Sequence, residues 1–254
     1  MENGFVQSLE RAFSILETLA KQPKGIGLVE LSGMVGLHKS TTHRFLSSLC
    51  AMGYVVKDSF SGRYRLTFKV MELSNNMLND IDILTVAKPH LDRLSHEVSE
   101  SVHLVMPDGA QVVYIYKTDS SNRSFQMRSK VGLRAPMYCT AVGKSILATM
   151  TEQQIAAIWA QSEVSAMTHN TIVELEPFLK ELSEIRGRGW AFDKEENEDG
   201  VSCIGVSISD YQGHAIAAMS ISAPSAQMAD EHIEALLPAI FACRDNIYRD
   251  MGIS

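Results

Sequence analysis

Residues 28–49, LVELSGMVGLHKSTTHRFLSSL, hold two short helical patterns separated by a glycine. The first pattern places Leu28, Leu31 and Val35 at helical spacing, and Gly36 follows where a left-handed residue most easily ends a helix. The second pattern opens at 38–40 and is predicted to bury Thr42, Phe45, Leu46 and Leu49. Two short helices around a tight glycine turn predict a helix-turn-helix.

The second helix is predicted to present a polar stripe on the side opposite its buried residues. Ser40, His43, Arg44 and Ser47 share that stripe. Hydroxyl, imidazole and guanidinium groups on one face of a short helix suit the DNA major groove. An ordinary helical hairpin with a solvated face would show the same pattern, so both interpretations stay open at this point. The DNA-contacting residues predicted on this helix are Lys39, Ser40, Thr41, His43, Arg44 and Ser47.

A β-hairpin is predicted directly after this helix. Residues 54–56 and 64–66 have strand-like composition, and a loop containing Gly62 joins them. This hairpin would form the wing of a winged helix-turn-helix. Lys57, Arg63 and Arg65 are placed to contact phosphates, which position a protein on DNA without reading its sequence.

Two further helices are predicted around this module. Residues 6–21 carry a stripe of Leu9, Phe13, Leu16 and Ala20, widened by Ala12 and Leu19, which is expected to close the module's core. Residues 67–78 resemble a connecting helix and would be a natural place for two chains to meet. Asn75-Asn76 and Asn79-Asp80 loosen this pattern and place a domain boundary near residue 80. The predicted domains are therefore 1–66, a linker at 67–80, and 81–254.

Charge divides the chain at the same point. Residues 1–79 have nine Lys and Arg against six Asp and Glu, whereas residues 80–254 have fourteen against twenty-four. A small basic module joined to a larger acidic one is typical of a DNA-binding unit coupled to another function. An excess of three positive charges is also within ordinary scatter, so it supports this interpretation without deciding it.

The second domain is predicted to be α+β. Strand patterns at 102–106 and 112–116 flank the turn at 107–109, and Phe125 and Met127 are expected to continue as a third strand. Helical patterns occupy 84–98, 140–150, 151–161 and 177–186. A final hairpin pairs 204–208 with 215–221, and a helix at 230–251 ends the chain. Strands at both ends with helices between them indicate an antiparallel sheet with helices packed on it.

Several classes of protein are disfavoured. The four cysteines are far apart and form neither a disulfide framework nor a zinc motif. No signal pattern or membrane-length apolar run is present, so a cytoplasmic protein with no membrane partner is expected. Gly143-Lys144-Ser145 lacks the earlier glycine of a phosphate-binding loop, because Tyr138 stands there. The acidic run at 195–199 has no nearby histidine and favours a solvated loop, so neither a metal nor a cofactor is expected.

Two later segments carry a family resemblance. Residues 140–148, TAVGKSILA, resemble the TAxGKxxLA segment of IclR-family transcription regulators, and residues 193–204 resemble that family's DxEExxxGxxCI signature. The recognition-helix segment KSTTHRFL is similar to the family's KSTVHRLL type. The resemblance runs in order from about residue 7 to the C-terminal helix. The chain departs from the family pattern after Ile204, where Gly-Val-Ser-Ile replaces Ala-Val-Pro-Val, and at Thr42, where Val or Ile is commoner.

The resemblance implies a winged helix-turn-helix joined by a linker helix to a GAF-like effector-binding domain. It also implies homodimers, often dimers of dimers, on operator DNA, and control by a small organic acid such as a keto acid or sugar acid. A transcriptional regulator, preferably a repressor, is expected rather than an enzyme. The effector pocket implied by the resemblance is lined by Met127, Ala141, Val142, Asp193, Cys203, Ser220 and Ser222.

The residues of this pocket have compatible chemistry. Ser220 and Ser222 are two apart on one predicted strand, so both hydroxyls face the same side and can hold a carboxylate. The N–H groups of residues 141–143, Gly143 included, lie at a predicted helix start that favours an anion. Asp193 can accept hydrogen bonds from ligand hydroxyls, so a hydroxylated acid would suit both ends.

Two alternatives to this pocket stay open. The serine pair could be the polar face of a strand, and Cys203 a buried small apolar residue. An enzyme built on a GAF-like domain is the alternative function, although no base for a Cys203 nucleophile is evident.

Overall fold

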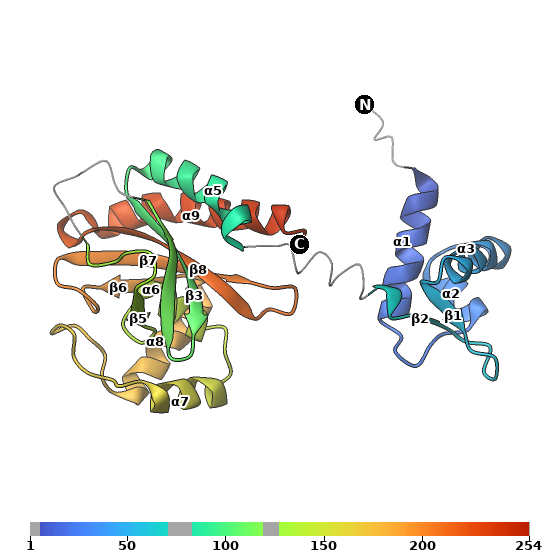
Figure 1. The fold of residues 1–254 in the computed structure, drawn as a ribbon, viewed down its shortest axis with the longest axis horizontal. Coiled ribbons are helices and arrows are strands. Elements are labelled where there is room, and N and C mark those ends of the chain that lie inside the picture. Colours follow the sequence, from blue (N-terminus) through green and yellow to red (C-terminus); the bar gives the residue numbers. More distant parts are fainter. Residues whose placement is uncertain (1–5, 71–82, 119–126, 254) are drawn as a thin grey trace. The chain divides into compact units, whose positions relative to one another are not determined.

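The computed structural model describes residues 6–70, 83–118 and 127–253. The chain forms two compact units, Met1–Asp80 and Ile81–Ser254 (Figure 1). The predicted linker helix at 67–80 falls largely on residues 71–82, which lie outside the described residues. No helix in the described part of the chain is long and apolar enough to cross a membrane.

The smaller unit is a winged helix-turn-helix, as the sequence predicts. Gly36 separates its second and third helices and has the left-handed φ of 65° that a helix end favours. The two strands pair antiparallel, with Val55 opposite Leu66. Its elements are α1 (Gln7–Ala20), α2 (Leu28–Met34), α3 (Lys39–Ala51), β1 (Val55–Lys57) and β2 (Tyr64–Leu66).

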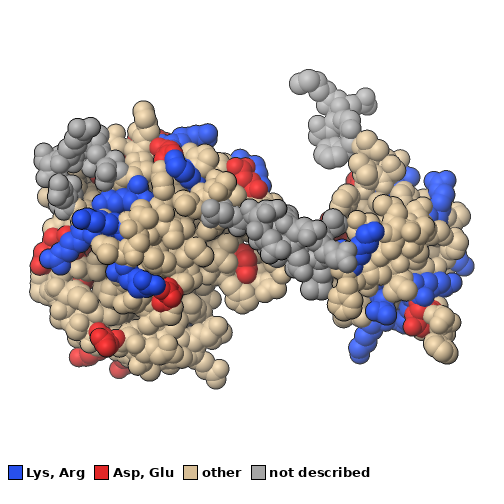
Figure 2. Space-filling model, viewed as in Figure 1, with Lys and Arg blue, Asp and Glu red and all other residues tan. Residues whose placement is uncertain are grey.

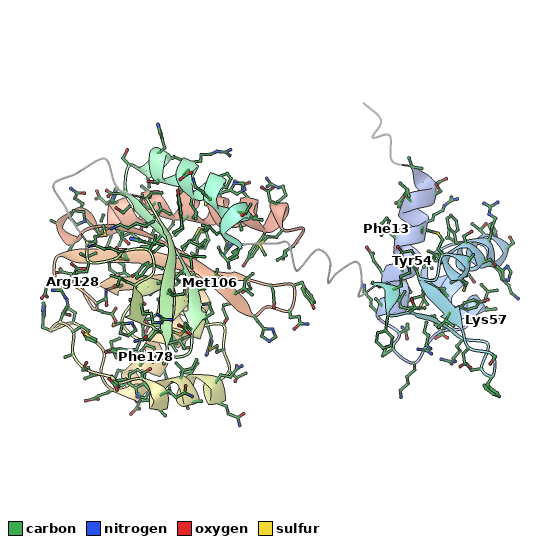
Figure 3. All side chains as sticks on the ribbon, viewed as in Figure 1. Phe13, Tyr54, Lys57, Met106, Arg128 and Phe178 are labelled. Carbon is green, nitrogen blue, oxygen red and sulfur yellow. The ribbon has the colours of Figure 1, made fainter. Side chains whose placement is uncertain are left out.

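Helix α1 buries a face that overlaps the predicted stripe only in part. Leu19, which belongs to the predicted stripe, packs in the core of the smaller unit together with Ile15, which does not. Leu9 is 57% exposed, and Phe13, labelled in Figure 3, is 59% exposed. The predicted stripe and the buried one share Leu19 and the same helical period, and they differ by a partial rotation of the helix. Packing against α2 and β2 selects that rotation, and local spacing does not encode it.

The larger unit is an α+β domain built on one antiparallel sheet in the order β5-β4-β3-β8-β7-β6. Its chain begins with α5 (Ile83–Val98), β3 (Ser101–Asp108), β4 (Gln111–Lys117) and β5 (Arg134–Pro136). The helices α6 (Ala141–Leu147), α7 (Glu152–Gln161) and α8 (Leu175–Arg188) follow. It ends with β6 (Ala191–Lys194), β7 (Val201–Ser209), β8 (Ala215–Pro224), the short 3₁₀ helix η1 (Ser225–Gln227) and α9 (Asp230–Asp250).

Helices cover both faces of the sheet (Figure 1). Helices α5 and α9 pack on one face, against residues such as Leu104, Ile204 and Met219. Helices α6, α7 and α8 pack on the other, against residues such as Val105 and Ala218. Because successive strand residues point to opposite faces, the strand neighbours of Leu104, Ile204 and Met219 point toward α6. This alternation places the polar residues of the central strands under α6.

Three strand and helix predictions need correction. Phe125 lies outside the described residues and Met127 lies outside any strand, so the third strand of that segment is β5. Strand β6 was not predicted, although its last two residues, Asp193 and Lys194, begin the 193–204 signature. The helix predicted over 140–150 is limited to α6, which Thr140 caps by accepting a hydrogen bond from the Gly143 N–H.

Candidate functional site

The predicted DNA-contacting stripe lies on the exposed side of α3. Ser40, His43, Arg44 and Ser47 are all exposed, while Thr42, Leu46 and Leu49 are buried on the opposite side. Lys39 is exposed at the start of the helix, and Thr41 is half-buried. An open hollow between the start of α2 and the start of α3 is lined by Leu28, His38, Lys39, Ser40 and His43.

The hairpin carries the three predicted phosphate-contacting residues. Lys57, Arg63 and Arg65 are exposed, and Figure 2 shows Lys and Arg side chains next to the hairpin of the smaller unit. Arg63 also has a structural contact, because its Nη1 donates to the Gly25 carbonyl oxygen at 2.9 Å. Lys57 and Arg65 are therefore freer to reach a phosphate than Arg63 is.

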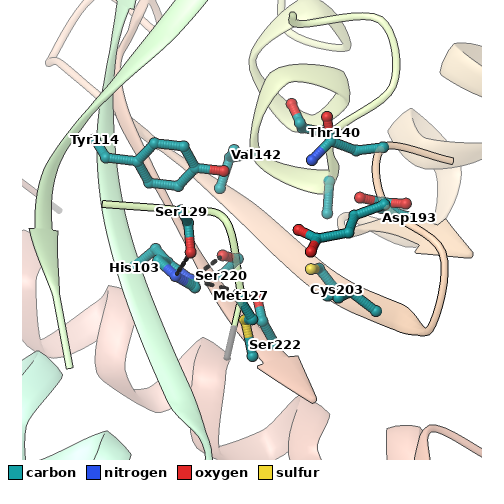
Figure 4. A pocket seen from close by; sticks show the side chains of 14 residues that line it. His103, Tyr114, Met127, Ser129, Thr140, Val142, Asp193, Cys203, Ser220 and Ser222 are labelled. Carbon is teal, nitrogen blue, oxygen red and sulfur yellow. Dashed lines mark hydrogen bonds between the residues drawn. The ribbon is translucent and has the colours of Figure 1, made fainter. Parts of the chain in front are cut away.

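A polar cavity lies in the larger unit between the sheet and the start of α6 (Figure 4). About 420 Å³ of space between its walls holds no protein atoms, and this figure includes space that is open to solvent. No Lys or Arg is among the described residues that line it. The lining residues are His103, Tyr114, Met127, Ser129, Thr140, Ala141, Val142, Asp193, Asn197, Glu198, Val201, Cys203, Ser220 and Ser222.

Strand pairing brings an imidazole and two hydroxyls together on one wall of this cavity. His103 on β3 lies opposite Ser220 on β8. Its Nδ1 is 3.4 Å from the Ser220 Oγ and 3.3 Å from the Ser222 Oγ, and its Nε2 is 2.9 Å from the Ser129 Oγ. Burial, with the charge of Lys117, lowers the pKa of His103 to about 3. His103 is therefore neutral at physiological pH.

The opposite wall carries carboxyl groups. Asp193 on β6 is buried, and its Oδ1 accepts a hydrogen bond from the Glu196 N–H at 2.7 Å. Burial, together with the nearby charge of Glu196, raises the pKa of Asp193 to about 7. Glu198 lines the same wall, and Cys203 lies opposite Asp193 on β7. This wall can accept hydrogen bonds from ligand hydroxyls, and Asp193 can also donate one when it is protonated.

A buried lysine stabilises the turn that positions Asp193. Lys144 on α6 is fully buried, and its Nζ donates to the Glu196 carboxylate and to the Phe192 carbonyl oxygen. Glu181 lies 3.5 Å from the same Nζ. Because Glu196 also supplies the N–H that binds Asp193, this ion pair connects α6 to the turn that positions Asp193.

Seven of the eight predicted effector residues line the cavity, and Gly143 does not. The Gly143 N–H already donates to the Thr140 Oγ1 at 3.2 Å. A Cβ at Gly143 would lie 2.3 Å from the Met137 Cα, so this glycine allows α6 to pack closely. The N–H groups of Ala141 and Val142, the first two residues of the helix, have no intrahelical acceptor.

Sequence reasoning missed half of the lining residues. The alternation of Val102, His103 and Leu104 does place His103 on the opposite face from its apolar neighbours. That signal could identify a polar position on the strand, but not its pairing with a strand 117 residues later. The missed residues are His103, Tyr114, Ser129, Thr140, Asn197, Glu198 and Val201. Within the described residues, no group of three or more His, Cys, Asp or Glu is arranged to hold a metal ion.

Comparison with protein families matches both units. Residues 8–59 match the IclR helix-turn-helix domain, and residues 75–249 match the bacterial transcriptional regulator IclR C-terminal domain. Together the two matches cover most of the chain, including α3 and the polar cavity.

Individual relatives agree with these matches. The DNA-binding transcriptional repressor YiaJ of Escherichia coli is 34% identical over 250 residues, covering 98% of this chain and 89% of the relative. The HTH-type transcriptional regulator KdgR of Escherichia coli is 34% identical over 247 residues, covering 97% of this chain and 93% of the relative. The crystal structure of the Agrobacterium tumefaciens repressor BlcR superposes with a TM-score of 0.77 at 26% identity, covering 99% of this chain and 100% of that one. This chain belongs to the IclR family of DNA-binding transcriptional regulators.

Proposed function

We propose that this protein is a repressor of a catabolic pathway that releases its operator when a small hydroxylated organic acid binds. Residues 1–66 would bind DNA, 67–80 would link the domains, and 81–254 would bind the effector. The carrying observation is the cavity itself, in which His103 and two serines face the buried carboxyl of Asp193. Relatives named as repressors support the sign of regulation.

The DNA-binding unit would act as a homodimer, or as a dimer of dimers. Two α3 helices would enter successive major grooves of a near-palindromic operator, about 34–36 Å apart. Arg44 or Lys39 would bond guanine edges or phosphates, and Ser40 would hold a phosphate. Thr41, His43 and Ser47 would complete the contacts of the helix. Such a regulator works where the chromosome is accessible, so we expect it in the cytoplasm.

The effector would span the cavity, with its carboxylate near hydrogen-bond donors and its hydroxyls near hydrogen-bond acceptors. The Ser220 and Ser222 hydroxyls and the N–H groups of Ala141 and Val142 can donate to a carboxylate. Asp193 and Glu198 can accept hydrogen bonds from hydroxyls at the other end. A sugar acid has both features in one molecule, and a hydroxylated keto acid has them as well.

Effector binding would change operator affinity through the dimer. The ligand must bind two dimer geometries unequally, because equal affinity shifts no equilibrium. A coupling of about 1–3 kcal/mol is typical of such systems.

The enzyme alternative lacks an activated group. Burial raises the pKa of the Cys203 thiol, so it is not a ready thiolate nucleophile. His103, whose pKa is lowered to about 3, is a weak base. The cavity therefore suits reversible binding better than turnover.

The experiment that tests this proposal is binding to the DNA directly upstream of the protein's own coding region. The measurement is repeated with a panel of sugar acids and keto acids. Saturable binding that one acid weakens supports an effector-relieved repressor. An acid that strengthens DNA binding would instead indicate the opposite sign. A folded protein that binds none of the acids in calorimetry would contradict the effector class.

Arg44 provides the test of the DNA-binding surface. If Arg44 bonds a base, Arg44→Ala should cost about 1–3 kcal/mol of operator binding and relax the preference at one base pair. Glu30→Ala on α2, which removes a negative charge from the same unit, is the control and should not weaken binding. Unchanged affinity in Arg44→Ala would remove Arg44 from the contacts.

A further inference from the structure

The tip of the β1–β2 hairpin carries a fully exposed aromatic side chain. Phe60 is 100% exposed, more than any other large apolar residue in the described part of the chain. Even the other exposed phenylalanines, Phe13 and Phe68, keep part of their surface covered. A phenylalanine without packing contacts adds nothing to the stability of the fold, because the hydrophobic effect requires its surface to leave water.

The turn that presents Phe60 is held by Asp58. The Asp58 Oδ1 accepts hydrogen bonds from the Phe60 N–H at 3.1 Å and from the Ser61 N–H at 2.7 Å. Backbone bonds across the loop add to this, since the Asp58 N–H donates to the Arg63 oxygen at 2.8 Å. The hydrogen bonds from Ser61 and Phe60 lower the pKa of Asp58, because they favour its charged form. The ring of Phe60 is therefore presented on a defined turn.

Positive charge surrounds this apolar tip. Lys57 and Arg65 are exposed on the two strands, and Arg63 is exposed at the end of the loop. The Lys57 Nζ lies 5.5 Å from the centre of the Tyr64 ring, which keeps it beside the hairpin. A partner for this surface needs negative charge close to a surface that can bury an aromatic ring. The DNA minor groove, with phosphates along both edges and stacked bases between them, has both features.

DNA is favoured over an acidic protein because of where the hairpin lies. Strand β1 begins at Val55, shortly after α3 ends at Ala51, and both belong to one compact unit. The helix and the hairpin therefore approach any operator together. With α3 in the major groove, we expect the adjoining hairpin to reach the neighbouring minor groove.

We propose that Phe60 inserts into the minor groove beside the α3 site and partly unstacks a base step there. Lys57 and Arg65 would hold the flanking phosphates. This proposal rests on operator binding by the helix-turn-helix unit. Apolar wedges of this kind bend DNA, so Phe60 would select operators with flexible pyrimidine–purine steps at positions that α3 does not touch.

The test uses the full-length chain and an operator selected by the wild-type protein from random DNA. Phe60→Ala should weaken operator binding about tenfold, because burial of an aromatic ring is lost. Phe60→Leu should retain most of the affinity. Tyr211→Ala is the matched control, since Tyr211 is an exposed aromatic in the β7–β8 turn of the other unit, and it should bind as the wild type does.

Salt dependence separates a wedge from a phosphate contact. Phe60→Ala should leave the slope of log K against log salt concentration unchanged, whereas Arg65→Ala should reduce it by about one. Energy transfer between labels at the two ends of the operator should show a smaller bend with Phe60→Ala. Circular dichroism of each variant confirms folding, which truncation of a fully exposed ring leaves intact.

Three outcomes would overturn the proposal. Operator affinity of Phe60→Ala equal to that of the wild type would exclude the wedge. An altered salt slope would assign the tip to an electrostatic contact. Normal DNA binding with loss of repression in a transcription reaction would assign Phe60 to a protein partner. Failure of the wild type to select any DNA would instead contradict the proposed function itself.

Discussion

The ammonium group of Lys144 is hydrogen-bonded to the carboxylate of Glu196, and both side chains are buried. The pair joins α6 to the turn after β6, which also holds the cavity residue Asp193. Loss of either partner leaves the other as a buried charge with an incomplete set of contacts, and this is more costly than loss of a surface pair.

Lys144→Met should therefore destabilise the larger unit by about 3–5 kcal/mol. Urea unfolding followed by tryptophan fluorescence measures this unit alone, because both tryptophans, Trp159 and Trp190, belong to it. Lys88→Met is the matched control, since Lys88 and Asp92 form an exposed pair, and it should cost less than about 1 kcal/mol. Adding Glu196→Leu to Lys144→Met should recover part of the loss. Equal losses for the two lysine variants would contradict the structural role of Lys144.

Effector binding should depend on pH through Asp193. Its pKa is raised to about 7 by burial and by the charge of Glu196, so the neutral carboxyl dominates below that pH. An anionic acid in a cavity whose described lining has no Lys or Arg is repelled by the ionised form. Affinity should therefore fall up to about tenfold per pH unit above pH 7.

Calorimetry with D-gluconate and the other acids of the panel, from pH 6 to pH 9, measures this dependence. Buffers of different ionisation enthalpy should reveal proton uptake on binding. Asp193→Asn keeps the shape of the side chain without its titration, and should make the affinity nearly independent of pH. The same pH dependence in this variant would assign the proton to another group.

Because of His103, the stability of the larger unit should fall as pH is lowered, whereas effector affinity should fall as pH is raised. In the folded chain its pKa is lowered to about 3, whereas the ordinary value is 6.5. Between these values the unfolded chain binds a proton that the folded chain excludes, so stability is lost as pH falls below about 6.5. The limiting slope is about 1.4 kcal/mol per pH unit.

Asp193 partly hides this effect in the wild type. The pKa of Asp193 in the folded chain is raised from 3.8 to about 7. Its contribution to stability is therefore present at low pH and is lost as pH rises through that range. Urea unfolding of Asp193→Asn between pH 4.5 and 7.5 should therefore show a steeper loss of stability on acidification than the wild type. Adding His103→Asn should remove the steep part. An identical pH profile for the wild type and Asp193→Asn would contradict one of the two assigned shifts.

Gly143 should not tolerate a side chain. A Cβ there would lie 2.3 Å from the Met137 Cα and 2.4 Å from the Met137 oxygen, and these are backbone atoms. Gly143→Ala should destabilise the larger unit by about 1–3 kcal/mol or more, because α6 must move away from its neighbour. Gly187→Ala in α8 is the control, since no atom lies within 4 Å of its Cβ position. That variant should be stabilised by about 0.5–1 kcal/mol in the same urea unfolding measurement.

The smaller unit was largely predictable because its signals are local. Helical spacing, the left-handed Gly36 and the two short strand patterns define the winged helix-turn-helix within a few residues of one another. The exposed stripe of α3, including Arg44, followed from the same periodicity. The face of α1 was predicted only in part: Leu19 is buried as expected, but the stripe omits the buried Ile15 and includes the exposed Phe13, because two apolar stripes share one period and only packing distinguishes them.

By itself, the sequence determined the family, the two-unit order of the elements and half of the residues that line the cavity. Tertiary structure decided that His103 shares that cavity with Ser220 and Ser222, that Gly143 serves packing, and that Asp193 titrates near neutral pH. The physical reason is distance along the chain. Periodicity tells which side of an element is buried, but the neighbour across a sheet depends on pairing between distant strands. A pKa depends on burial and on charges, such as Lys144 and Glu196, that meet only in the folded protein.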